Sequence, residues 1–184
     1  MIRVKSLLLL TFLLFISGCT NSNPVGSSLN LGETPGMDCV PGGDGVSRMF
    51  GDTFLIHEGE GEITITDISL VNADGLELKE AVLVKLNPDE ALLGFGEWPP
   101  TDTPEFPLPE NWDDRIEAVD AKIQPNDKWN LVFALTSTSP DTGSADAVKI
   151  EYKDSAGKTF EQETLIRYFI TSSKCEEVLK TNPL

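Results

Sequence analysis

The sequence predicts an all-β fold: a two-layer antiparallel β-sandwich, immunoglobulin-like, with about seven to eight strands. Three observations lead to this prediction. Apolar and polar residues alternate in many short segments, turns rich in Gly, Pro and Asn separate them, and beyond the N-terminal segment no helical spacing extends over about ten residues. Because parallel strands need a helix-length crossover, the missing helices also argue against a parallel βαβ fold.

The first strands are expected at residues 53–57 and 62–71. The second of them changes phase, because two isoleucines share one face and the apolar residues that follow have the opposite parity (Ile63 and Ile65, then Ile68 and Leu70). One extra residue near Thr66 and Asp67 would produce this change. We therefore expect a β-bulge there.

The segment "NADG", residues 72–75, predicts a tight turn, because Asn and Gly tolerate positive φ. It leads into a strand whose apolar residues stay in register (Leu76, Leu78, Val82, Val84 and Leu86). We expect the strands on the two sides of the turn to form a hairpin.

The second half of the chain repeats this pattern. A strand is expected at 116–123, and after the turn "QPNDK", residues 124–128, the segment "WNLVFAL" alternates over residues 129–135. Two further alternating segments flank the turn "KDSAGK", residues 153–158, and predict a second hairpin (Val148, Ile150 and Tyr152, then Phe160, Thr164, Ile166, Tyr168 and Ile170). Only short helical turns are expected, at 87–93 and 173–180.

The N-terminus has the composition of a secretory signal. Arg3 and Lys5 precede an apolar run over residues 7–16, which is too short for a spanning helix of about 20 residues. The run ends in "ISGC", Ile16-Ser17-Gly18-Cys19, which resembles the lipobox of bacterial lipoproteins, with Ile16 where Leu is commoner. An ordinary secretory signal that ends near a cysteine is the alternative.

The lipobox resemblance covers residues 1–19 and implies the fate of the chain. Residues 1–18 would be a signal peptide, cleaved before Cys19, and the Cys19 thiol would carry a diacylglyceryl group with fatty chains such as palmitate. Two or more acyl chains hold a protein stably on a bilayer. The expected location is thus the extracytoplasmic side of the bacterial cell envelope. The segments "WNLVFAL" and "VKIEYKDSAGKTF" are broadly similar to those of small envelope lipoproteins, but this likeness transfers no functional residue.

Length and charge limit the possible organisation and partners. Removing residues 1–18 leaves 166 residues, which is enough for one domain. We divide them into a flexible Gly/Pro/Ser/Asn tether, 19–49, and a β-sandwich domain, 50–184. The mature part has 12 basic and 30 acidic residues, a formal charge of −18. Because such a surface repels phosphate groups, nucleic acid is not expected as a partner.

Two cysteines remain once Cys19 is lipidated. Cys39 and Cys175 would lie where disulfides persist, so we expect them to pair and to close a long loop. Two free thiols, or Cys39 with Met37 as soft metal ligands, are the alternatives. Immunoglobulin domains usually place their cysteines on facing central strands, whereas these two flank the domain.

The most unusual segment is "EWPPTDTPEFPLPENW", residues 97–112. It holds five of the chain's 12 prolines, so it predicts a long loop outside the sheets, partly in polyproline II geometry. Long loops in compact domains are often functional. Its large apolar residues could dock a protein partner or fold back as a lid over one sheet (Trp98, Phe106, Leu108 and Trp112).

Metal and catalytic sites find little support. The turn "NADG" lacks the remaining oxygen ligands of a calcium loop. We expect it, "DTGSAD" at 141–146 (Asp141, Ser144 and Asp146) and the region of Asp38 and Asp44 to be turns or solvated loops. The lone His57, which we expect at the surface of a strand, gives no chelating pair with Met37 or Met49. No hydrolase, phosphate-loop, Cys-x-x-Cys or His-Glu-x-x-His motif occurs. We therefore name no catalytic, cofactor or metal residue.

These observations favour a non-enzymatic, lipid-anchored extracytoplasmic module that interacts with another envelope protein. The alternative is a small-ligand or cation-binding lipoprotein that serves a transporter or a sensor, with loops near 97–112 or 141–146 as the site. An enzyme is a third, weaker hypothesis. The oligomeric state does not follow from the sequence.

Overall fold

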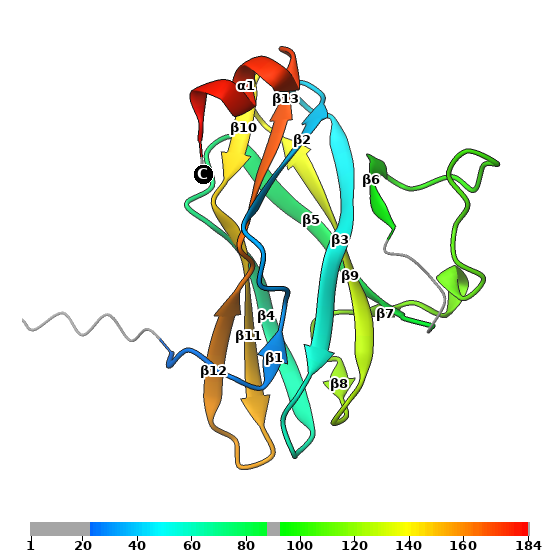
Figure 1. Cartoon of the computed structure of the whole chain (residues 1–184), viewed down its shortest axis with the longest axis vertical. Helices are drawn as coiled ribbons and strands as arrows, with labels where there is room; N and C mark the ends of the chain where they lie inside the picture. The colour runs from blue at the N-terminus through cyan, green and yellow to red at the C-terminus, as the bar shows by residue number, and fades with distance from the viewer. Residues whose placement is uncertain (1–22, 88–92, 184) are drawn as a thin grey trace, which may run out of the picture.

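We describe a computed structural model of the chain, over residues 23–87 and 93–183 (Figure 1). Over these ranges the protein is a two-layer β-sandwich, which confirms the expected all-β class. None of its helices there has the length and apolar character needed to span a bilayer. Cys19, the lipobox and most of the helical turn expected at 87–93 lie outside the described residues.

One layer of the sandwich is a six-stranded sheet in the order β1-β3-β9-β5-β7, and β6 also pairs with β3. Strand β9 occupies one edge of β3, so β1 and β6 share the other edge. The bounds are β1 Leu29–Asn30, β3 Ser47–His57, β5 Leu76–Lys85, β6 Gly94–Glu97, β7 Ile116–Glu117 and β9 Lys128–Ser137.

The other layer consists of two smaller sheets. Four strands lie in the order β12-β11-β4-β8, and three in the order β10-β13-β2. Figure 1 shows the first group at the lower end of the molecule and the second at the upper end. The bounds are β2 Gly36–Pro41, β4 Ile63–Val71, β8 Lys122–Ile123, β10 Thr142–Ala145, β11 Ala147–Asp154, β12 Thr159–Glu163 and β13 Ile166–Thr171. A short helix, α1 Cys175–Thr181, closes the upper end, and a single 3-10 turn, η1, spans Trp112–Asp114.

The expected β-bulge is present in β4. Glu151 of β11 lies opposite Asp67 and Tyr152 lies opposite Ile65, so Thr66 is the extra residue. This insertion turns both apolar pairs of β4 toward the core, and Ile65 and Ile68 are both buried. The phase shift in the sequence therefore located the bulge correctly.

The hairpin predicted at "NADG" does not form. Asn72 and Gly75 do have positive φ, but β4 pairs with β11 and β5 pairs with β9, in opposite layers. The turn is a corner between the two layers, and Asp74 forms a bridge with Ser144. A turn flanked by alternating segments is compatible with either arrangement, because alternation reports burial and not the pairing partner.

The second predicted hairpin is correct for β11 and β12 only. These strands pair as expected around residues 153–158, but the chain leaves the sheet at Thr164 and Leu165. It resumes as β13 in the other small sheet, between β10 and β2. The alternating segment is thus divided between two sheets.

Part of the expected tether belongs to the sandwich. Strand β2 pairs in parallel with β13, and Leu29, Leu31 and Val40 are buried in the core. A segment of this composition cannot bury enough surface to fold alone, but here it adds to the edge of a sheet that already exists. The strands therefore begin well before residue 50, and thirteen of them lie within the described ranges.

The core between the layers is centred on three aromatic side chains, Phe50, Phe133 and Tyr168. Tyr168 packs edge-on against both phenylalanines, with ring centroids 5.3 and 5.1 Å apart. All three are fully buried. Burial of its hydroxyl raises the pKa of Tyr168 above its usual range, so this side chain stays neutral.

Candidate functional site

A proline-rich arm, residues 98–115, stands beside the outer face of the six-stranded sheet (Figure 1). The sheet is apolar on this face as well, and a second buried cluster lies there (Met49, Val82, Val84, Leu93 and Val132). The four large apolar side chains predicted from the loop pack against this cluster (Trp98, Phe106, Leu108 and Trp112). The structure therefore brings the four residues together as the lid alternative expects, and docking of a partner stays a prediction.

Hydrogen bonds hold the arm in one shape. The backbone N–H of Phe106 donates to Thr103, and the N–H of Leu108 donates to Asp102 Oδ1 at 3.0 Å. At the far end, Asn111 Nδ2 donates to the carbonyl of Lys85 on β5 at 2.7 Å. The arm is thus an ordered surface, attached to the sandwich at more than its two ends.

The base of the arm is tied to the sheet by Asn130, which is buried on β9. Its amide nitrogen donates to the Gly51 carbonyl at 2.9 Å, where β3 is bulged, and its oxygen accepts from the Leu93 N–H at 3.0 Å. A buried amide without these partners would be costly. Asn130 therefore positions Leu93 and the start of β6, the strand that leads into the arm.

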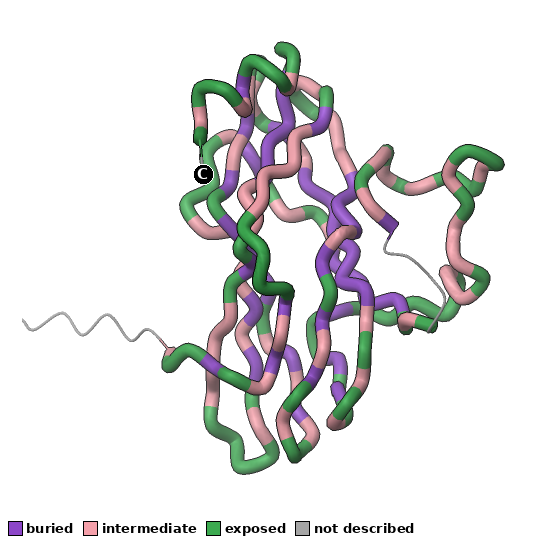
Figure 2. The backbone as a smooth tube through the Cα atoms, viewed as in Figure 1, coloured by how far each residue is buried: buried purple, intermediate pink, exposed green. Residues whose placement is uncertain are grey.

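Acidic side chains cover the outside of the arm. Five carboxylates are on the arm and three on its flanks, and all eight residues are exposed (Asp102, Glu105, Glu110, Asp113 and Asp114, with Glu97, Glu117 and Asp120). Arg115 is the sole basic residue between 97 and 120, and its guanidinium lies 4.6 Å from the Trp112 ring. Figure 2 shows the arm as exposed and intermediate residues beside the buried strands. The arm therefore combines an apolar inner side with a strongly acidic outer side.

Two hollows adjoin β6. One, of about 260 Å³, lies between β2 and β6 and is lined by Cys39, Val40, Pro41, Arg48, Phe95, Gly96 and Glu97. The other, of about 280 Å³, lies between β6 and the arm and is lined by Gly96, Glu97, Pro100, Thr101, Thr103 and Phe106. Because Gly96 and Glu97 line both, the hollows adjoin one another along the edge strand.

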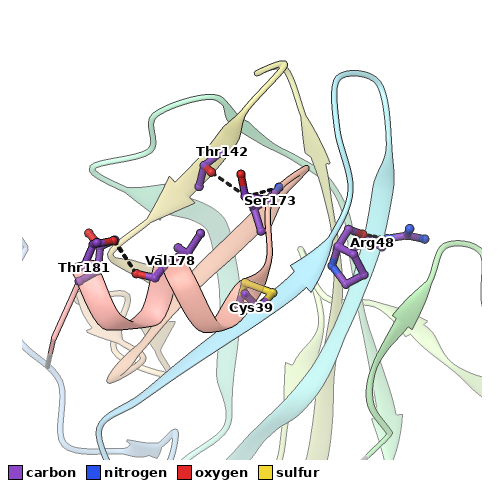
Figure 3. The surroundings of a disulfide bond; sticks show 10 residues. Cys39, Arg48, Thr142, Ser173, Val178 and Thr181 are labelled. Carbon is purple, nitrogen blue, oxygen red and sulfur yellow. Dashed lines mark hydrogen bonds between the residues drawn. A yellow bond between two sulfur atoms is a disulfide. The ribbon is translucent and has the colours of Figure 1, made fainter.

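The disulfide predicted between Cys39 and Cys175 is present (Figure 3). It joins β2 to the first residue of α1, with Cα atoms 5.6 Å apart and a sequence separation of 136. Helix α1 contributes Val178, which is buried. The bond thus fastens the C-terminal helix to the strand that completes the upper sheet.

His57 is buried, with 1% of its surface exposed, and the prediction of a surface position was wrong. Its Nδ1 and Nε2 lie 2.9 and 2.6 Å from the carbonyl oxygens of Ser28 and Gly61. Strand β1 covers the end of β3 here, which the sequence did not indicate. Met49 lies in the outer cluster near the other end of β3, so these two candidate metal ligands are not brought together.

The acidic loops considered for cations are occupied by protein contacts. "DTGSAD" contains strand β10 and is not a free loop. Asp146 forms an ion pair with Arg167 at 3.3 Å and accepts a hydrogen bond from Asn72 of the "NADG" turn at 3.0 Å. Among residues 23–87 and 93–183, no three His, Cys, Asp or Glu side chains are grouped so as to hold a metal ion.

The sequence did not predict one acidic pair, Asp38 and Asp52. Asp38 on β2 and Asp52 in the β3 bulge face each other at hydrogen-bonding range between the layers, and each keeps a buried oxygen with no other partner. Burial, followed by the hydrogen bond and the charge of Asp52, raises the pKa of Asp38 to about 8. Asp52 interrupts the apolar segment "MFGDTFLI", which is the one signal in the sequence, but nothing linked it to Asp38.

Comparisons with known proteins assign no family. No family model matches the chain, and no curated protein matches it either. Among solved structures, an ASH / PapD-like domain of human CEP192 (PapD-like domain 7) has a TM-score of 0.42 and 6% identity, over 84% of this chain and 91% of that one. The secreted serine protease VesC from Vibrio cholerae has a TM-score of 0.33 and 7% identity, over 83% of this chain and 25% of that one. Neither similarity assigns a role to any residue here.

Proposed function

We propose that this protein is a non-enzymatic, lipid-anchored module on the extracytoplasmic side of the bacterial envelope, and that it binds another envelope protein through the arm. The observation that carries the proposal is the arm itself. Residues 98–115 are ordered by Thr103, Asn111 and the aromatic lid, yet they present a row of exposed carboxylates. An ordered, projecting and highly charged loop is typical of a binding surface.

A binding role also agrees with the surroundings of the single histidine. Hydrolases that use Ser or Cys need a general base near the nucleophile. His57 lies in the interior with both ring nitrogens close to backbone carbonyl oxygens, so it is poorly placed to accept a proton from a Ser or Cys nucleophile. This geometry supports a module that acts by binding.

The lipid anchor is tested by mass spectrometry and fractionation. We expect the protein purified from its native membranes to begin at Cys19 and to carry the mass of a diacylglyceryl group on that residue. Cys19→Ser should leave the protein in the soluble fraction or as an unprocessed precursor. Normal processing and membrane retention of the variant would overturn the anchor.

The partner is tested by site-specific photo-crosslinking in intact cells. A photoreactive residue replaces Glu105, which is exposed on the arm, or Ala156, which is exposed in the turn between β11 and β12 at the lower end of the other layer (Figure 1). We expect a discrete crosslinked protein from position 105 and none from position 156. Equal labelling from both positions, or none from position 105, would contradict a docking role for the arm.

A further inference from the structure

We propose that the edge of β6, with the two hollows beside it, binds an extended segment rich in Lys and Arg on the partner protein. This inference rests on the proposed function and names the chemistry of the partner. It follows from the free strand edge, the apolar floor of the hollows and the charge around them.

The strand edge comes first. Strand β6 has four residues, and among the described residues it pairs only with β3. Part of its backbone donors and acceptors therefore point away from the sheet, and such an edge can pair with an extended chain. The edge thus favours an extended occupant.

The floor of the hollows suits the aliphatic part of long side chains. Phe95, half-exposed at 49%, lines one hollow, and Phe106 with Pro100 lines the other. Lysine and arginine can lay their methylene stems on such surfaces while their charged ends reach water. Alternate side chains of a paired segment would then fall on opposite sides of β6.

The charge of the rim selects the occupant. Glu97 is exposed between the two hollows, and Asp102 and Glu105 lie on the neighbouring arm. Among the eight exposed acids of residues 97–120, only Glu97 and Asp113 form an ion pair within the described chain, at 3.6 and 3.9 Å. Because the Glu97 side chain stays 87% exposed in its pair with Arg48, Glu97 and the unpaired carboxylates can attract a cationic segment and steer its approach.

The same charges disfavour the other occupants of an open edge. A second copy of this chain would bring two acidic arms together, with a formal charge of −18 on each mature chain. An anionic lipid surface would be repelled for the same reason. A basic extended segment can pair with the backbone edge of β6, lay its side-chain stems on the apolar floor of the hollows, and offset the charge of the surrounding carboxylates.

Peptide binding to the full chain in nonionic detergent tests the inference. The probes are fluorescent peptides of about twelve residues that alternate Lys with Val, Glu with Val, or Ser with Val. We expect the Lys peptide alone to bind, and to bind less tightly as salt is raised. The variant Glu97→Gln/Glu105→Gln should weaken it about tenfold, since two charge contacts are lost.

The matched control is Glu33→Gln/Glu60→Gln. It removes two exposed charges, beside β1 and in the turn after β3, away from β6, and should leave the affinity unchanged. Phe95→Ser should weaken binding while circular dichroism and the Tm stay as in the wild type. The inference would be overturned if both double variants weakened binding of the Lys peptide equally, or if the Ser peptide bound as tightly as the Lys peptide. Dimerisation of the wild type that Phe95→Ser abolishes would also overturn it. If none of the peptides bound the wild-type protein, the inference would also be overturned, whereas a crosslink from position 105 would still support the proposed function.

Discussion

The two faces of the six-stranded sheet are covered in different ways. On the inner face, Phe50 and Phe133 pack against Tyr168 of the other layer, and all three are fully buried. On the outer face, Met49 and Val132 from the same strands are also fully buried, but their cover is the arm. The arm's four large apolar residues each remain partly exposed.

This difference separates stability from recognition. Adjacent residues of a strand point to opposite faces, so an apolar run such as "NLVFAL" must be buried on both faces of the sheet. The second layer supplies one as a packed core. The arm supplies the other while keeping its outer side in water, where its charges can meet a partner. Four substitutions test this separation, each expected to change the stability less than the one before.

The largest loss of stability is expected when the disulfide between β2 and α1 is removed. Cys39→Ser/Cys175→Ser opens a loop with a sequence separation of 136, and the chain-entropy model gives a loss of about 4–5 kcal/mol in the free energy of unfolding. Urea denaturation followed by circular dichroism measures it. A loss below about 1 kcal/mol would mean that β2 and α1 are held mainly by packing.

Phe133→Ala probes the inner core directly. The substitution leaves a cavity beside Phe50 and Tyr168, so we expect a loss of about 4 kcal/mol in the free energy of unfolding. Affinity for the Lys peptide should be unchanged at temperatures where the variant is folded. A selective loss of affinity in a folded variant would contradict the separation of the two faces.

Trp112→Ala probes the outer cover. Trp112 is partly exposed and packs edge-on against Trp98 with ring centroids 6.5 Å apart, so we expect a smaller loss, of about 2 kcal/mol. Binding of the Lys peptide should weaken, because the arm loses its support. Measuring stability and affinity on the same preparation decides the comparison, and a loss as large as that of Phe133→Ala would show that the arm is part of the folding core.

The smallest effect is expected at the seam between the layers, where Asp38 meets Asp52. The folded-state pKa of Asp38, about 8, lies above the usual value of 3.8, so between these values the folded state holds the extra proton. Stability is therefore expected to fall as pH rises from about 4 to about 8. Asp38→Asn should remove this slope.

The asparagine variant can also donate a hydrogen bond to the Asp52 carboxylate without needing a shared proton. We expect it to be more stable than the wild type by about 1 kcal/mol near neutral pH, a modest gain because Asp38 is only partly buried. Urea midpoints measured at acidic, neutral and alkaline pH for both proteins provide the check. Parallel pH profiles would show that the two carboxyl groups do not share a proton.

Local patterns were sufficient where neighbours along the chain decide the outcome. The phase change in residues 62–71 located the bulge at Thr66, and alternation located β5, β9 and β11. The cysteine count predicted the disulfide, and the prolines predicted a loop outside the sheets. Aromatic residues in that loop indicated a lid as one of two readings.

Local patterns failed where distant segments compete for the same edge or space. The turn at "NADG" connects two layers, since β4 and β5 each find a longer partner elsewhere. Strand β2 has the composition of a tether, and it is ordered by backbone bonds to β13 and by the Cys175 disulfide. His57 is buried because β1, a two-residue strand, covers the end of β3.

From residue type and spacing, the sequence predicted the secondary structure of many segments, the all-β class and the acidic character of the arm. The cysteine count favoured a disulfide but left two free thiols or a metal site as alternatives. The folded structure was needed to show which strands pair, that the apolar side of the arm lies on the sheet, and that Asp38 meets Asp52. Backbone hydrogen bonds are the same for every residue, so the packing of the whole chain selects the partner of each strand.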